Sequence, residues 1–241
     1  MGFAIVAGGN PNMAAPMTGI AASALAVGST VKLMESGAAV EYLVVNQGIP
    51  SNSNLYDASC DGTWILRKDC VAAREWDSGN SNIYADSDIN TWLNGDFFNT
   101  LGSVEQAAVK QVKIPYCVGN KSSTIKKGSN GLSVKAFLLG GYEVGWTTSD
   151  SRYFPVDGVK LDYFLASSAG KSKRIAYRNG SAAYWWLRSP YVSDANYGWL
   201  VYIDGDNTRL TVAGSFGIRP ALILPKTALF DEDTVILKGV A

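Results

Sequence analysis

The chain has 241 residues, with 21 Lys and Arg balanced by 21 Asp and Glu and with no histidine. This length suffices for a domain with a substantial core, and the zero net charge without long basic runs argues against nucleic-acid binding. Because histidine is the commonest metal ligand and general base, the composition favours a protein without a metal, a cofactor or a catalytic centre.

The first 30 residues are predicted to form an arm. They carry no charge and consist mostly of small residues. A secretory signal would have a basic start and an unbroken apolar centre, which Gly8, Gly9 and Asn10 interrupt here. We interpret residues 1–30 as an arm for oligomerisation or attachment, with a flexible tail as the alternative. Residues 31–241 are predicted to form one domain.

Regular structure is predicted to begin near Thr30. Residues 30–48, TVKLMESGAAVEYLVVNQG, alternate apolar and polar side chains around a turn at residues 35–37, which predicts two paired strands. Residues 63–69, TWILRKD, predict another short strand.

Two consecutive helices are predicted within residues 86–112, DSDINTWLNGDFFNTLGSVEQAAVKQV, where apolar residues recur at steps of three and four. Ser87 or Asp88 can cap the first helix and Gly102 ends it. Residues 103–106, SVEQ, match a capping box and predict Ser103 as the cap of the second helix.

The sequence after Pro115 predicts loops and short strands. Residues 119–131, GNKSSTIKKGSNG, predict a solvated loop, and residues 132–146, LSVKAFLLGGYEVGW, a buried segment. Aromatic residues recur throughout these irregular segments. The predicted fold class is therefore α+β, in one compact domain with much irregular structure.

The cysteine count and the hydropathy of the chain argue against a disulfide-rich protein and against a membrane protein. Cys60, Cys70 and Cys117 form no C-x-x-C pair and are too few for a disulfide framework. We expect buried free thiols, with a Cys60–Cys70 bridge as the alternative. No apolar stretch approaches the ~20 residues of a membrane helix, so no membrane insertion is expected.

Two short sequences, which we call clamps, enclose a segment of different amino-acid composition near the C-terminus. The first clamp is WWLRSP, residues 185–190, and the second clamp is GIRP, residues 217–220. The enclosed segment, residues 191–216, is rich in Tyr, Ser, Gly and Asn, which is typical of an adaptable binding surface. The guanidinium groups in the clamps can bind loop carbonyls or a buried carboxylate. The residues expected to be structural are Trp185, Trp186, Arg188, Trp199, Gly217, Arg219 and Pro220.

A loop and a hairpin are predicted inside the enclosed segment. Residues 191–198 form the loop, residues 198–214 the hairpin and residues 204–207, DGDN, its turn, with a calcium site as the less favoured alternative there. Alternation places Leu200 on the binding side and Val201 on the other. The apolar run at 221–225 predicts a central strand. The predicted ligand-binding residues are Tyr191, Ser193, Asp194, Asn196, Tyr197, Leu200, Tyr202, Asp204, Asp206, Asn207, Arg209, Thr211 and Phe216.

Three motifs in order, GYEVGWTTSDSRYFPVDG, YWWLRSP and GIRPAL, carry a family resemblance. They resemble the C-type lectin-like domains of the formylglycine-generating-enzyme type, and more narrowly the variable proteins of diversity-generating retroelements in phages and bacteria. The resemblance covers roughly residues 30–225. It implies a C-type lectin-like fold in which adenine-directed mutagenesis rewrites the enclosed segment and the fold displays it as a ligand-binding face.

The same resemblance implies a non-enzymatic function. Phage members of this group are receptor-binding proteins at tail fibre tips, which implies a virion location, a host-surface protein or glycan as ligand, and a homo-oligomer, by analogy a trimer. The arm would then contact sister subunits or other virion proteins. The alternatives are a structural virion protein, a cellular variable protein and an oxidase related to the formylglycine-generating enzyme. The oxidase is disfavoured because all three cysteines precede residue 120.

Residue usage in the enclosed segment agrees with adenine-directed mutagenesis. Mutated adenines in an AAC or AAT codon cannot yield Lys, Glu, Gln, Met or Trp, and these types make up 33 of the 241 residues. Between three and four are therefore expected among the 26 enclosed positions, but only Trp199 occurs. Because the Trp codon TGG contains no adenine, Trp199 is expected to belong to the scaffold, together with Val201, Gly205 and Gly217.

Overall fold

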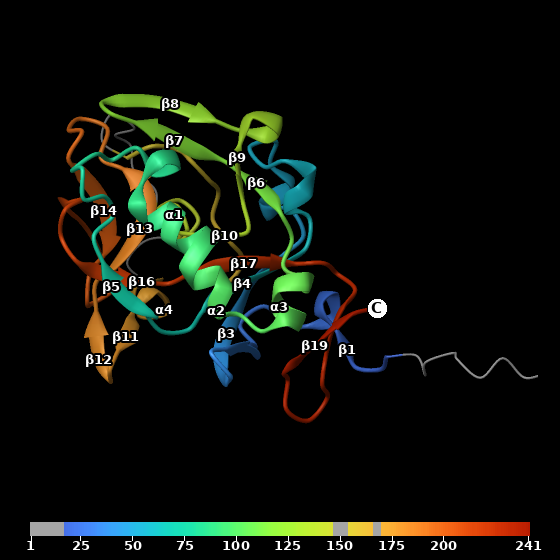
Figure 1. Cartoon of the computed structure of the whole chain (residues 1–241). Helices are drawn as coiled ribbons and strands as arrows, with labels where there is room; N and C mark the ends of the chain where they lie inside the picture. Colours follow the sequence, from blue (N-terminus) through green and yellow to red (C-terminus); the bar gives the residue numbers. More distant parts are fainter. Residues whose placement is uncertain (1–16, 147–153, 166–169) are drawn as a thin grey trace, which may run out of the picture.

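The computed structural model describes residues 17–146, 154–165 and 170–241 (Figure 1). These residues form a mixed fold of helices and strands, which confirms the predicted α+β class. Their buried apolar side chains make one core cluster that extends from Ala22 to Leu237.

The central sheet has five strands in the order β10-β17-β4-β3-β2, and all neighbours are antiparallel. The predicted first hairpin is confirmed, because Ser36 and Gly37 adopt positive φ between β2 and β3, as a tight hairpin turn requires. The predicted central strand is also confirmed, since β17 lies between two neighbours and is fully buried. The strands are β2 Thr30–Glu35, β3 Ala38–Gln47, β4 Thr63–Arg67, β10 Ala136–Phe137 and β17 Ala221–Leu224.

The second sheet contains both clamps and has the order β15-β14-β13-β16-β5. β13 and β16 are parallel, and the other neighbours are antiparallel. The chain passes directly from one sheet to the other between β4 and β5 and, through the second clamp, between β16 and β17. The strands are β5 Ala72–Arg74, β13 Trp185–Pro190, β14 Tyr197–Val201, β15 Asn207–Thr211 and β16 Phe216–Ile218.

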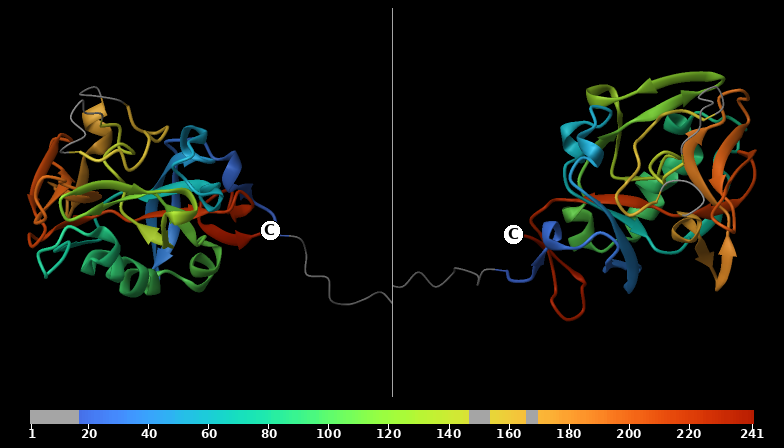
Figure 2. Two further views of the ribbon diagram at one scale, coloured as in Figure 1. Left: turned by 90° about the horizontal axis from the view of Figure 1, so that it is seen from above. Right: turned by 180° about the vertical axis from the view of Figure 1, so that it is seen from behind.

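The two predicted helices are confirmed and lie along one side of the molecule (Figure 2). The first is capped by Ser87, whose hydroxyl accepts a hydrogen bond from the Asn90 N–H. The predicted capping box is wrong: Gly102 occupies the cap position of the second helix, and the Gln106 side chain donates to the Leu101 carbonyl instead. The helical segments are α1 Asp88–Trp92, the π-helical turn η5 Leu93–Phe97, α2 Phe98–Thr100, α3 Ser103–Ala108 and α4 Lys171–Arg174.

Short hairpins and single helical turns complete the described fold. The loop predicted at residues 119–131 is partly wrong, because positive φ at Asn120 and Lys121 turns the chain into a β7–β8 hairpin. The short strands are β1 Ile20–Ala21, β6 Val112–Ile114, β7 Tyr116–Gly119, β8 Ser122–Lys126, β9 Leu132–Val134, β11 Ala176–Arg178, β12 Ser181–Ala183, β18 Ala228–Phe230 and β19 Leu237–Val240. The 3-10 turns are η1 Ala22–Ala24, η2 Pro50–Asn52, η3 Ala58–Cys60, η4 Tyr84–Asp86 and η6 Gly128–Asn130.

The predicted boundary between arm and domain at residue 30 is wrong. Strand β1 pairs with β18, with Ile20 opposite Phe230, and Ala22 is fully buried in the core. Residues 17–30 therefore belong to the folded domain, because their backbone and side chains complete its small third sheet. Residues 1–16 lie outside the described residues, so the arm stays a prediction for them.

All three cysteines are buried and unpaired, which confirms the expected free thiols and makes the Cys60–Cys70 bridge wrong. Burial raises the pKa of the Cys70 thiol to about 11 and that of Cys60 and Cys117 to about 12, so all three are protonated at neutral pH. None of the described helices is long and apolar enough to cross a membrane.

Candidate ligand-binding site

The first clamp is built around a fully buried ion pair. The Arg188 guanidinium donates to both carboxylate oxygens of Glu143, at 2.6 and 2.7 Å, and also to the carbonyls of Pro115, Leu138 and Asp157. Burial alone would lower the pKa of Arg188, but the Glu143 carboxylate raises it above its usual range. The expectation that this guanidinium binds carbonyls and a buried carboxylate is confirmed.

A second buried carboxyl group lies beside this pair. Ser189 donates its hydroxyl hydrogen toward the Asp157 carboxylate, 2.9 Å from each oxygen, and accepts from the Gly141 N–H. Burial raises the pKa of Asp157 to about 6 despite the nearby guanidinium of Arg188. The first clamp thus contacts a buried acid, Asp157, through Ser189.

Arg219 of the second clamp makes fewer hydrogen bonds than Arg188 of the first. Arg219 is buried over the ring of Trp185, 4.7 Å from its centre, and its Nε donates to the Arg67 carbonyl at 3.0 Å. Its Nη1 has no hydrogen-bond partner among the described residues, and burial lowers the pKa of Arg219 to about 10. The two clamp arginines are therefore both buried, but Arg219 leaves one of its donor groups without a partner among the described residues.

The other predicted scaffold residues are buried as well. Trp185, Trp186 and Trp199 are at most 8% exposed, and Pro220 is buried. Gly217 has no room for a side chain, because a Cβ atom there would lie 2.5 Å from the Tyr184 carbonyl oxygen. The close approach of Tyr184 and Cys70 therefore requires glycine at this position.

The loop of the enclosed segment is anchored by a residue that sequence reasoning missed. Asn82 is fully buried, and its side-chain amide donates to the carbonyls of Tyr191, Asp194 and Tyr197 at 2.8–3.1 Å. Its backbone N–H donates to the Ala195 carbonyl at 2.8 Å. All these bonds reach the main chain of the loop, so they do not depend on which side chains the loop carries.

The predicted hairpin is confirmed and is anchored in the same manner. The Trp76 N–H donates to the Val212 carbonyl at 2.9 Å, and Arg174 Nε donates to the Gly205 carbonyl at 2.7 Å. Gly205 has a φ of +84°, and a Cβ atom there would lie 2.0 Å from the Lys171 carbonyl oxygen. The turn therefore requires glycine.

The predicted ligand-binding side chains of the enclosed segment fall into buried, half-buried and exposed groups. Leu200 is fully buried against Trp186, so its predicted place on the binding side is wrong. The exposed predicted residues are Ser193, Asn196, Tyr197, Asp204, Asn207, Arg209 and Thr211. The half-buried ones are Tyr191, Asp194, Tyr202, Asp206 and Phe216.

The accessible side chains do not form the single face that the sequence predicted. On one side of the second sheet, the strand register places Thr211 opposite Tyr197, and the Arg209 guanidinium lies 4.6 Å above the ring of Tyr191. Tyr202 and Phe216 belong to the other side, with Leu200 and Trp186, and both rings contact Tyr184. At the turn, Lys171 pairs with Asp206 at 2.7 Å and lies 4.0 Å from Asp204.

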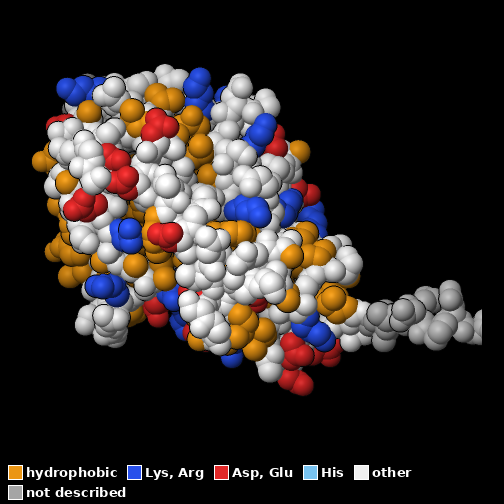
Figure 3. Space-filling model, in the orientation of Figure 1, with side chains coloured by type: hydrophobic (Ala, Val, Ile, Leu, Met, Phe, Trp, Pro, Cys, Tyr) orange, Lys and Arg blue, Asp and Glu red, His pale blue; other side chains and the backbone are white. Residues whose placement is uncertain are grey.

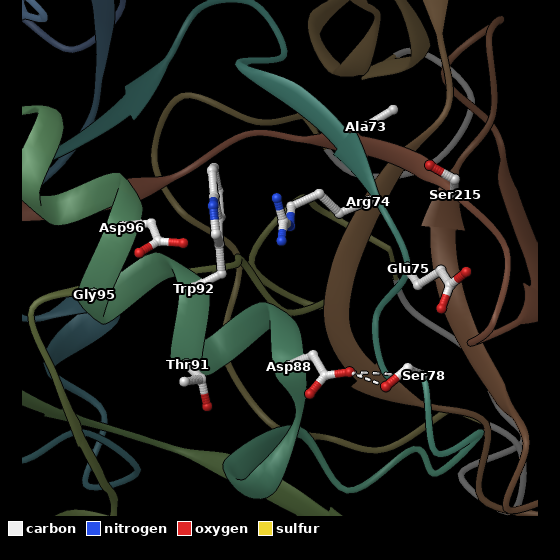
Figure 4. A pocket seen from close by; sticks show the side chains of 10 residues that line it. All are labelled: Ala73, Arg74, Glu75, Ser78, Asp88, Thr91, Trp92, Gly95, Asp96 and Ser215. Carbon is white, nitrogen blue, oxygen red and sulfur yellow. Dashed lines mark hydrogen bonds between the residues drawn. The ribbon is translucent and has the colours of Figure 1, made fainter.

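A hollow of about 610 Å³ lies between β5 and the α1–η5 helix and was not predicted (Figure 4). The guanidinium of Arg74 points at the ring of Trp92, 5.0 Å from its centre. Asp88 accepts two hydrogen bonds from Ser78, which lower its pKa. Ser215 lines the hollow too, so the hollow borders the enclosed segment.

A smaller hollow of about 270 Å³ adjoins the first. Its lining includes Tyr184 and Phe216, and it shares Ala73 and Ser215 with the larger hollow. Acidic and basic side chains lie among hydrophobic ones on the side of the molecule that carries β5, β14 and α1 (Figure 3). No local pattern in the sequence marks these hollows, because their walls come from segments about 120 residues apart.

Comparison with known proteins assigns one family. Residues 61–226 match the domain of unknown function DUF6273. The matched region contains both clamps, the enclosed segment, the whole second sheet and three strands of the central sheet, β4, β10 and β17. No curated protein and no solved structure matches the chain.

Proposed function

The chain belongs to the DUF6273 family, and from this premise we propose that it is a ligand-binding protein displaying the enclosed segment on a C-type lectin-like scaffold. One observation carries the proposal: the anchors of the enclosed segment come from outside it and bind its main chain. Asn82, Trp76 and Arg174 supply these anchors. Side chains between the clamps can then change while the backbone keeps its path.

The side chains displayed at the loop and on β15 suit recognition. Tyr197 is 38% exposed, Asn207 and Thr211 are exposed, and Arg209 is exposed above the Tyr191 ring. Tyrosine and arginine are common binding anchors because they offer large contact area and directed hydrogen bonds at modest entropy cost.

The proposed biological role is that of a receptor-binding protein at a phage tail fibre tip, which recognises a protein or glycan on the host surface. The resemblance of the clamps to variable proteins of diversity-generating retroelements supports this role, as does the residue usage of the enclosed segment. The proposed assembly is a homotrimer in which residues 1–16 contact sister subunits or other virion proteins.

An alanine scan read for both binding and stability tests the proposal. We expect Tyr197→Ala or Arg209→Ala to weaken binding to host cells by about 2 kcal/mol while changing stability by only about 0.5 kcal/mol. Tyr177→Ala on β11 is the matched control, because Tyr177 is 48% exposed and lies outside the enclosed segment. Binding losses that follow losses in melting temperature across the segment would contradict the proposal.

A further inference from the structure

The two hollows lie next to each other at β5 and β16, because Ala73 and Ser215 line both of them, and we call them together the groove. Arg74, which lines the larger hollow, is paired across these strands with Phe216, which lines the smaller one. The ring of Phe216 lies 5.6 Å from that of Tyr184, which lies 4.7 Å from that of Tyr202. A row of half-buried aromatic rings therefore extends from the groove to the end of the predicted binding hairpin.

Charged groups of both signs are available in the larger hollow. Arg74, Glu75 and Asp96 are exposed, and their side chains form no hydrogen bond or ion pair with the described residues. In Figure 4, Arg74 lies between Trp92 and the strand, with the Asp96 carboxylate beyond the same ring. A ligand here meets a fork of donors and two carboxylate acceptors within one hollow.

We propose that this groove binds a neutral, hydroxyl-rich glycan chain next to the enclosed segment. Sugar hydroxyls donate to carboxylates and accept from a guanidinium at the same time, so they use both signs of charge, and the flat faces of sugar rings pack on aromatic rings. An anionic ligand would meet the uncompensated carboxylates of Glu75 and Asp96, and a basic peptide would meet Arg74. The larger hollow, at about 610 Å³, lies within the range of roughly 300–1,000 Å³ of small-ligand sites.

This inference rests on the proposed binding function and names its ligand class. The walls of the groove come mainly from β5, the α1–η5 helix and the β11–β12 hairpin, and only Ser215 and Phe216 among its lining residues belong to the enclosed segment. The groove would therefore recognise a feature common to many surface glycans, and the enclosed segment would add selectivity.

The test measures binding of the full chain to a printed panel of neutral and anionic oligosaccharides, and to host cells treated with periodate or with protease. Periodate cleaves the vicinal diols of sugars, whereas protease removes surface proteins. We expect binding to neutral oligosaccharides, loss of cell binding after periodate, and retention after protease. Glu75→Gln and Arg74→Gln should each weaken glycan binding about tenfold, as loss of a charged hydrogen bond predicts. Glu232→Gln, at an exposed glutamate in the β18–β19 connection, is the matched control and should bind as the parent does.

The outcomes separate this inference from the proposed function. Loss of cell binding in Tyr197→Ala or Arg209→Ala, with full binding in the groove variants and after periodate, would overturn the glycan groove and leave the display function standing. Binding lost only after protease would identify a protein ligand and likewise overturn the groove. Full cell binding in every variant would contradict both proposals.

Discussion

Asp157, which contacts the first clamp, is expected to make the stability of the fold depend on pH. Its folded-state pKa is raised to about 6 by burial, from an ordinary value of 3.8. The folded state therefore binds this proton more tightly than the unfolded state does. The resulting stabilisation is complete below the unfolded pKa near 4 and is lost as pH rises through the folded pKa near 6.

Asp157→Asn removes this titration and keeps an oxygen that can accept from Ser189. Between pH 4 and pH 7, the unfolding free energy of the variant should rise relative to that of the parent, by up to about 3 kcal/mol. Denaturant titrations of both proteins at several pH values measure this difference. A difference that stays constant between pH 4 and pH 7 would mean that Asp157 is not a buried titrating acid.

The clamp arginines should differ in their contributions to stability. Arg188→Met would leave the Glu143 carboxylate buried and unpaired, and removing one partner of a buried pair costs about 3–5 kcal/mol. Arg219→Met should cost less, because Nη1 of Arg219 already lacks a partner among the described residues and methionine can keep the contact with Trp185. Urea melts of the two variants give the order, and an equal or reversed order would contradict this account of the clamps.

Among the elements, the loop at residues 191–197 depends most on a distant side chain. Asn82→Ala should cost about 2–3 kcal/mol, since it leaves loop carbonyls without their donor, and should accelerate hydrogen exchange of residues 191–197. Hydrogen exchange read by mass spectrometry follows both the loop and the β17 strand.

Asn46→Ala is the matched control for this variant. Asn46 is equally buried but donates to the carbonyls of Gln47 and Gly48, far along the chain from the loop. It should lower stability without accelerating exchange at residues 191–197. Equal acceleration in both variants would show that the loop responds to global stability and not to the Asn82 anchor.

Local patterns were sufficient to predict some elements. Ser36 and Gly37 in the first hairpin and Gly205 in the second mark turns through their own backbone preferences, and Ser87 marks a helix start. The clamp residues that the sequence analysis expected to be structural are also buried in the fold. In each case the information lies within a few residues of the element.

The misplaced residues depend on distant partners. Alternation assigned Leu200 to the solvent side, but β14 is covered on both sides, with Trp186 and Trp76 beside one and Phe154 beside the other. Asn82 lies in a short polar stretch without a motif, and its function comes from carbonyls more than 100 residues later. Neither fact can be derived from nearest neighbours in the sequence.

At the scale of the whole molecule, the proposed trimer predicts a role for residues 1–16. The full chain should be a trimer at micromolar concentration, and a chain beginning at Met17 should be monomeric but equally stable, because β1 remains paired with β18. Light scattering and thermal melting of both chains test this. A monomeric full chain would remove the assembly part of the proposal.

The central claim is that the fold fixes the backbone between the clamps independently of the exposed side chains. It is tested most directly by the fraction of folded members in a library randomised at exposed positions of the segment. Those positions are Ser193, Asn196, Tyr197, Asn207, Arg209 and Thr211. A second library, randomised at Trp199, Leu200 and Val201, serves as the comparison. We expect most members of the first library to melt within about 4 °C of the parent, equivalent to ~1 kcal/mol, and almost none of the second. Equal folded fractions in the two libraries, or a first library that mostly fails to fold, would contradict the claim.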